Sequence, residues 1–147
     1  MRVLIQRVKK ASVLVNEALI SEIGTGLLLF VGIGFDDGSK DAGYAARKIA
    51  GLRIFSDEQG KMNRNVLDAQ GEVLSVPQFT LFADIRHGNR PGFDTAAEQV
   101  IAKRLWEQFN QNLCGTGIPV KTGVFGADME VCLVNDGPVT IWLDSRA

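Results

Sequence analysis

Residues that bind metals or form disulfides are scarce in this sequence. Its 147 residues include one histidine, His87, and two cysteines, Cys114 and Cys132. The cysteines show no metal-ligand or redox spacing and lie in apolar sequence, so we expect both to be reduced and buried. One histidine and two distant cysteines do not make a zinc site of the usual kind. The sequence therefore predicts a protein without a metal or another cofactor.

The sequence also lacks a strong net charge and a long apolar run. Its formal net charge is −1, which argues against a protein that binds nucleic acid along an extended track. The longest apolar run, Leu27–Val31, is too short to span a bilayer. Charge at Arg2 and Arg7 interrupts the beginning of the chain, unlike a signal peptide. We therefore expect a cytoplasmic protein that does not enter a membrane.

The composition is that of an ordinary globular domain. Hydrophobic residues make up 46% of the chain and charged residues 22%. A chain of this length buries about two-thirds of its unfolded surface. No repeat, linker or low-complexity segment divides it, so residues 1–147 are expected to form one domain.

Hydrophobic periodicity predicts several strands and two helices. The strands are expected over Val3–Val8, Ser12–Asn16, Ala18–Ile23, Leu27–Ile33, Arg53–Ser56, Glu72–Val76, Asp128–Val134 and Val139–Leu143. One helix is expected over Lys40–Ala50, and another from a capping box at Thr95–Glu98 to about Asn112. The buried stripe of the second helix is predicted to be Val100, Ile101, Leu105, Phe109 and Leu113. These patterns predict a single α+β domain, with two helices packed against a strongly curved, barrel-like sheet of mixed or antiparallel strands.

Two short stretches place a proline and polar groups in apolar, strand-like sequence: Val76–Leu81 and Asn135–Thr140. A proline removes a hydrogen-bond donor from a sheet, so an interior strand normally excludes it. Read alone, Asn135-Asp136-Gly137-Pro138 predicts a tight turn between the last two strands. An X–Pro bond is also the one kind for which a cis peptide costs only about 0.5–1 kcal/mol.

Together, Gln78-Phe79-Thr80-Leu81 and Asn135-x-Gly137-Pro138-Val139-Thr140 resemble the signature pair of the D-aminoacyl-tRNA deacylase family. Further motifs extend the resemblance in order over essentially the whole chain: Ile5-Gln6-Arg7-Val8, Ala11-Ser12-Val13, Gly24-x-Gly26-Leu27-Leu28, Arg53-Ile54-Phe55-Ser56-Asp57, Gly60-Lys61-Met62-Asn63, Gly123-x-Phe125-x-Ala127-x-Met129 and Trp142. The resemblance implies the fold of that family. It also implies an editing hydrolase that uses water to cleave D-aminoacyl-tRNA, and mischarged glycyl-tRNA, into free amino acid and tRNA.

The first motif offers catalytic candidates but no activated nucleophile. Thr80 has no base nearby within Pro77–Phe82. His87 lies in a loop rich in Gly and Arg, which favours a solvated or phosphate-facing imidazole over a catalytic triad. A site of main-chain groups in Gln78, Phe79 and Thr80 is therefore preferred, and one oxyanion donor of this kind is typically worth about 3–4 kcal/mol. The resemblance implies the same reliance on main-chain groups and on the terminal ribose of tRNA.

The second motif is implied to be a chiral selector in a homodimer. In the family the Gly-Pro peptide, carried here by Gly137-Pro138, is cis and enters the active site of the partner subunit. It excludes an L side chain by a clash, and about 4 kcal/mol would give a preference of about a thousandfold. Arg7 fits a strut that holds carbonyls of this turn, and a surface arginine fits equally well. Phe125 and Met129 fit either a pocket wall or core packing.

One position departs from the family pattern. The family usually has Ser before Gln-Phe-Thr-Leu, whereas this chain has Pro77, as does a related editing family active on certain L-aminoacyl-tRNAs. At Phe79 and Val139 the chain keeps the deacylase residues. The sequence favours a D-aminoacyl-tRNA deacylase. The alternatives are an L-specific editing deacylase and a nucleic-acid-binding dimer without catalysis.

Overall fold

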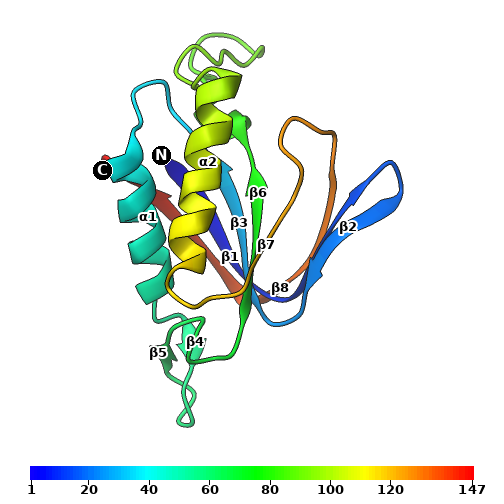
Figure 1. Ribbon diagram of the computed structural model, residues 1–147, viewed down its shortest axis with the longest axis vertical. Coiled ribbons are helices and arrows are strands. Elements are labelled where there is room, and N and C mark those ends of the chain that lie inside the picture. Colours follow the sequence, from blue (N-terminus) through cyan, green and yellow to red (C-terminus); the bar gives the residue numbers. More distant parts are fainter.

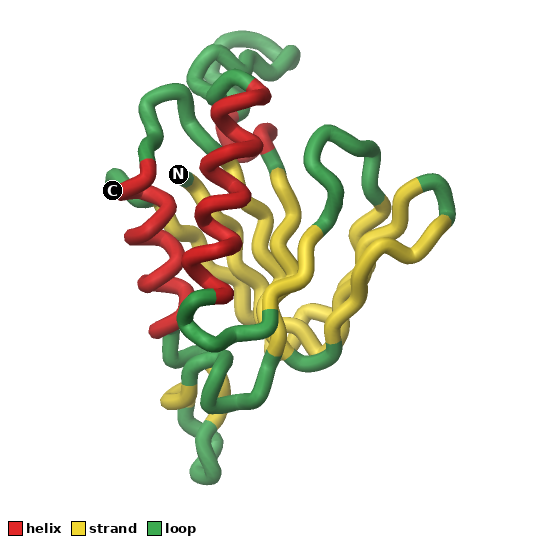
Figure 2. The backbone as a smooth tube through the Cα atoms, in the orientation of Figure 1, coloured by secondary structure: helices red, strands yellow, loops and turns green.

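A computed structural model describes all 147 residues as two helices packed on a curved, nearly closed sheet (Figures 1 and 2). The helices are α1 (Ser39–Gly51) and α2 (Gln99–Cys114), and η1 (Phe79–Phe82) is a short 3-10 helix. The strands are β1 (Arg2–Val15), β2 (Ala18–Ile23), β3 (Gly26–Gly32), β4 (Phe55–Ser56), β5 (Met62–Arg64), β6 (Glu72–Pro77), β7 (Val120–Thr122) and β8 (Glu130–Asp144). The predicted α+β fold, with its two helices and barrel-like mixed sheet, is confirmed.

Strand β1 organises the sheet because it is long enough to pair with three other strands. One edge pairs with β8 in antiparallel register from Arg2 to Leu14. The other edge pairs first with β3, up to Val8, and then with β2, from Ala11 onward. Strand β6 joins β3 in parallel, and β7 joins β6 in parallel.

Side-chain hydrogen bonds connect the two ends of this sheet. Ser21 of β2 donates from Oγ to the Thr122 carbonyl of β7 at 2.8 Å, and Lys121 donates from Nζ to the Glu22 carbonyl at 2.7 Å. The sheet therefore curves into a barrel-like shape, and Figure 1 shows the two helices lying side by side across one of its faces.

The main hydrophobic core lies between the helices and the sheet. Helix α1 contributes a stripe of small residues and one isoleucine: Ala42, Ala45, Ala46 and Ile49. Helix α2 contributes larger side chains, including Phe109 and Trp106. The indole Nε1 of Trp106 donates to the hydroxyl of Ser75 at 2.9 Å, and Ser75 is the one fully buried polar residue. At Gly26, strands β3 and β6 come so close that a Cβ atom would lie 1.9 Å from the Glu72 carbonyl oxygen.

Helix α2 begins later than predicted. Its N-cap is Glu98, and no side-chain capping bond forms there, so the predicted Thr95–Glu98 capping box is wrong. Residues 95–97 are held instead by the segment after β3: Phe35 donates to the Thr95 carbonyl and Ala97 donates to the Ile33 carbonyl, both at 3.0 Å. With this start, Val100 is 82% exposed and Ile101 is 38% exposed, so neither belongs to the buried stripe.

Two other local predictions fail. The two expected closing strands form one strand, β8, which continues through Gly137-Pro138. Cys114 and Cys132, which were expected to be buried, are free but exposed. The strand expected over Glu72–Val76 forms as β6, and the motif after it turns into η1. No helix has both the length and the apolar character required to cross a membrane.

Candidate active site

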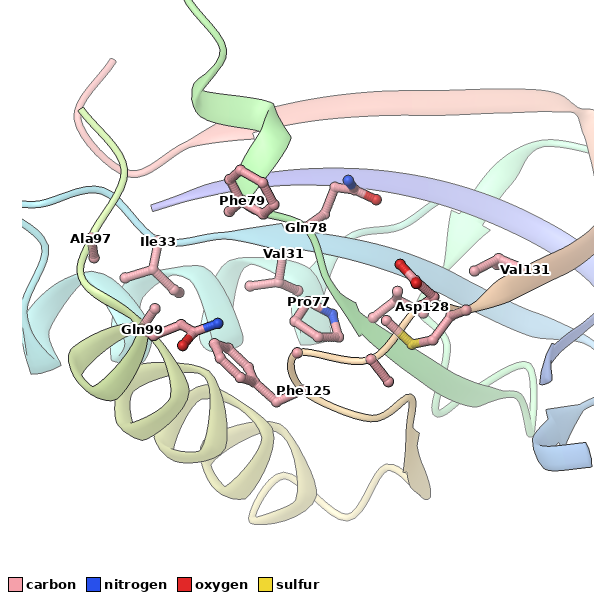
Figure 3. A pocket seen from close by; sticks show the side chains of 15 residues that line it. Val31, Ile33, Pro77, Gln78, Phe79, Ala97, Gln99, Phe125, Asp128 and Val131 are labelled. Atoms are coloured by element: carbon pink, nitrogen blue, oxygen red, sulfur yellow. The ribbon is translucent and has the colours of Figure 1, made fainter. Parts of the chain in front are cut away.

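A cavity of about 500 Å³ opens where β3 and β6 end beside the first turn of α2 and the loop between β7 and β8. Ten of its fifteen lining residues are hydrophobic. Figure 3 shows Val31, Pro77 and Phe125 bordering it, with Phe79 and Gln99 at the end nearer to η1 and α2. The cavity is therefore mainly apolar, with a few polar groups at its border.

The first signature motif borders this cavity through Gln78 and Phe79, whereas Thr80 lies just outside its lining. Gln78 donates its backbone N–H to the Val31 carbonyl at 2.8 Å, and Leu81 donates the first hydrogen bond of the 3-10 turn to the Gln78 carbonyl at 3.4 Å. The amides of Phe79 and Thr80 lie between these two bonds. Because they open the short helix, they have no acceptor within it. One unpaired backbone donor therefore belongs to a lining residue, Phe79, and a second belongs to its neighbour Thr80.

The hydroxyl of Thr80 is not activated as a nucleophile. It accepts a hydrogen bond from the Gln78 side-chain amide, and neither a carboxylate nor an imidazole bonds to it. His87 is exposed in the loop after η1. In that loop, the hydrogen bond from the Arg86 side chain holds the pKa of Asp84 at about 2. The geometry of this region therefore matches a site of backbone groups better than a Ser/Thr nucleophile.

Phe125 and Met129 both line the cavity, on the loop between β7 and β8. The thioether of Met129 accepts a long hydrogen bond of 3.4 Å from the Val124 amide. The same sulfur atom lies 2.7 Å from the position that a Cβ atom on Gly123 would occupy. Phe125 packs on Trp106 of α2, with ring centroids 5.8 Å apart. The loop is therefore held closely against the body of the domain.

The second signature motif forms a hydrogen-bonded bulge on β8. The Gly137-Pro138 peptide is cis, as predicted, and both residues are exposed. The side-chain amide of Asn135 donates to the Arg7 carbonyl at 2.9 Å and to the Val139 carbonyl at 3.1 Å. Thr140 donates to the Asn135 side-chain oxygen at 3.3 Å. These contacts explain why the motif combines Asn and Thr with the Gly-Pro pair.

Arg7 is only 11% exposed and contacts this bulge directly. Its Nε donates to the Asp136 carbonyl at 3.3 Å and lies the same distance from the Asp136 carboxylate. Its Nη1 donates to the Ile54 carbonyl at 2.6 Å. Arg7 therefore fastens the Gly-Pro bulge to the segment that leads into β4.

Within one chain, the bulge and the cavity are separate. Neither Gly137 nor Pro138 lines the cavity that Gln78 and Phe79 border. The structure thus brings together Gln78, Phe79, Phe125 and Met129, and separately Arg7, Gly137 and Pro138. The sequence interpretation missed two polar lining residues, Gln99 and Asp128. The sequence could have indicated Asp128, because this residue occupies a variable position of the Gly123–Met129 motif.

Comparisons with known proteins identify the family of the chain. The sequence model of the D-Tyr-tRNA(Tyr) deacylase family matches residues 4–144. A D-aminoacyl-tRNA deacylase of Thermomicrobium roseum is 57% identical over 145 residues, covering 99% of this chain and 94% of that protein.

Two solved structures have the same architecture. A c-Myc DNA unwinding element binding protein superposes with a TM-score of 0.95 at 43% identity, with both chains fully covered. A probable eukaryotic D-amino acid tRNA deacylase superposes with a TM-score of 0.84 over 97% of both chains, and at 16% identity it supports the fold alone. The chain belongs to the D-Tyr-tRNA(Tyr) deacylase family, and it is therefore a hydrolase. The predicted family is confirmed.

Proposed function

We propose that this protein hydrolyses the ester bond that joins a D-amino acid to the terminal ribose of tRNA. The observation that carries the proposal is the apolar cavity lined by Phe79, whose amide and that of the next residue, Thr80, have no acceptor within η1. An aminoacyl ester is already activated. Its hydrolysis needs a positioned water molecule and a stabilised oxyanion more than it needs a strong nucleophile.

In the proposed reaction, water adds to the ester carbonyl and the oxygen of that carbonyl becomes an oxyanion. The amides of Phe79 and Thr80 donate to this oxyanion, and each such donor is typically worth about 3–4 kcal/mol. Gln78 keeps the Thr80 hydroxyl in place through its side-chain hydrogen bond. The intermediate then expels the ribose oxygen, which leaves with a proton, and free amino acid and tRNA are released. The reaction is proposed to occur in the cytoplasm, where aminoacyl-tRNA is made.

Chiral selection is proposed to take place between two subunits of a homodimer. Gly137 and Pro138 are exposed and do not line the cavity of their own chain, so they are free to enter the cavity of a partner. Carbonyls of this turn would then face the Cα atom of the amino acid and exclude an L side chain. Glycine has no side chain and would be accepted, so mischarged glycyl-tRNA is a proposed second substrate. Equilibrium sedimentation is expected to show a dimer, and an active monomer at micromolar concentration would contradict this arrangement.

Deacylation of one tRNA charged in turn with a D-amino acid, its L enantiomer and glycine tests the proposed function. We expect rapid hydrolysis of the D ester and of the glycyl ester, with the L ester left nearly intact. Pro77, which lines the cavity, is the observation that favours the other candidate, an editing enzyme for certain L-aminoacyl-tRNAs. Preferential hydrolysis of the L ester would establish that candidate. Binding without hydrolysis of any of the three would refute both.

A further inference from the structure

We infer that Asp128 binds the α-ammonium group of the amino acid during this reaction. Asp128 lines the cavity in the loop that also carries Phe125 and Met129. It is the only ionisable residue among the fifteen that line it. The inference deepens the proposed function and rests on it, because it assigns a residue to one chemical group of the same substrate.

The carboxylate of Asp128 is free to accept a ligand. The residue is exposed and forms neither an ion pair nor a side-chain hydrogen bond within the chain. Other aspartates of the chain are engaged: Asp57 accepts from backbone amides of its own turn, and Asp84 is paired with Arg86. Figure 3 shows the Asp128 carboxylate among the side chains on the Pro77 and Val131 side of the cavity.

The substrate carries one positive charge that matches this carboxylate. In an aminoacyl ester, the ammonium group is attached to Cα. The neighbouring carbonyl oxygen is the atom to which the Phe79 and Thr80 amides would donate hydrogen bonds. The other polar lining side chains, Gln78 and Gln99, are neutral. A carboxylate and an ammonium form a charge-assisted hydrogen bond, which is stronger than one between neutral groups.

This contact has a consequence for chirality. The backbone amides hold the carbonyl and Asp128 holds the ammonium, so two of the four groups around Cα are fixed. The other two groups are the hydrogen and the side chain. A steric selector then distinguishes the enantiomers by a clash, because the side chain faces it in one enantiomer and the hydrogen faces it in the other. Asp128 would thus orient Cα so that the selector can distinguish the two enantiomers.

Two esters that differ in this group alone test the inference. One is tRNA charged with D-phenylalanine, and the other is tRNA charged with D-phenyllactic acid, in which a hydroxyl replaces the ammonium. Asp128→Asn is expected to lower kcat/KM for the phenylalanyl ester by about tenfold, the equivalent of about 1.4 kcal/mol. It is expected to change kcat/KM for the phenyllactyl ester by less than about twofold. Asp128→Glu keeps the charge and is expected to retain most of the preference for the ammonium ester.

Glu130→Gln is the matched control. Glu130 is exposed, lies two residues further along the chain and does not line the cavity. The Glu130→Gln substitution removes one negative charge close to Asp128. Any general electrostatic effect on tRNA binding should therefore appear in both variants. An equal loss on the two esters in Asp128→Asn, or the same change of preference in Glu130→Gln, would overturn the inference. Wild-type protein that hydrolyses neither ester nor glycyl-tRNA would instead refute the proposed function, and the inference with it.

Discussion

The Nη2 atom of Arg7 lies 2.9 Å from the position that a Cβ atom on Gly137 would occupy. The guanidinium therefore stands directly against the Gly-Pro bulge, and it is held there by the carbonyls of Ile54 and Asp136. Gly137 also has a φ of +119°, which side-chain-bearing residues rarely adopt. Both the backbone and the neighbouring arginine require glycine at this position.

Gly137→Ala is expected to displace the bulge while the domain stays folded. A methyl group at this position would meet Arg7 and Val139 at 2.9–3.0 Å. If the bulge is the chiral selector, the ratio of kcat/KM for D over L substrates should fall by at least about tenfold. Kinetics with paired D- and L-aminoacyl-tRNAs measure this ratio. Gly60→Ala is the control, because Gly60 has a φ of +79° but no atom within 4 Å of an added Cβ. An unchanged ratio in Gly137→Ala would falsify the selector role.

Thr80→Ala is expected to retain most of the deacylase activity. The Thr80 hydroxyl has Gln78 as its partner and no base, and the substitution leaves the backbone amides in place. Loss of the bond to Gln78 should cost less than about tenfold in kcat, in line with a neutral hydrogen bond of about 0.5–1.5 kcal/mol. Single-turnover kinetics measure the chemical step. A loss beyond about a thousandfold in a folded variant would mean that the hydroxyl acts directly.

Activity on aminoacyl-tRNA is expected to depend only weakly on salt. The net charge of the chain is −1. We therefore expect the protein to contact only a few phosphates, at the single-stranded end of tRNA. For about two to four such phosphates, log K should fall against log salt with a slope of roughly −1.5 to −3. Binding measured at several salt concentrations gives this slope. A value near −8 would indicate that the protein contacts much more of the tRNA.

Ser75→Ala is expected to destabilise the domain although it removes a single hydroxyl. The buried Trp106 indole would lose its partner, and an unpaired buried donor costs about 1–3 kcal/mol. Urea denaturation measures the free energy of unfolding. Trp106→Phe in the same background supplies the comparison: the double variant should lose less stability than the sum of the two single variants. Full additivity would show that the hydrogen bond contributes nothing.

Several features of this protein follow from local sequence alone. The strands expected over Ser12–Asn16 and Ala18–Ile23 pair as a hairpin, and Asn16 and Glu17 between them adopt the positive φ that such two-residue turns require. The helix expected over Lys40–Ala50 forms over Ser39–Gly51, and its alanines and Ile49 are buried on one face. Periodicity works in these cases because the turn and the helix face depend on residues that are close in the chain. The catalytic and selector candidates were likewise found from short motifs.

Long-range contacts decided the rest. Helix α2 starts at Gln99 because residues 95–97 bond to the chain after β3, sixty or more positions away in the sequence. Strand β8 continues through Gly137-Pro138 because β1 pairs with it on both sides of the bulge and Asn135 bonds across it. Asp128 and Gln78 border one cavity, whereas Gly137 lies outside it, because the curvature of the sheet places the ends of β3 and β6 beside the β7–β8 loop. Pairing between distant segments leaves no periodic signal in either of them, so only the tertiary structure could reveal these arrangements.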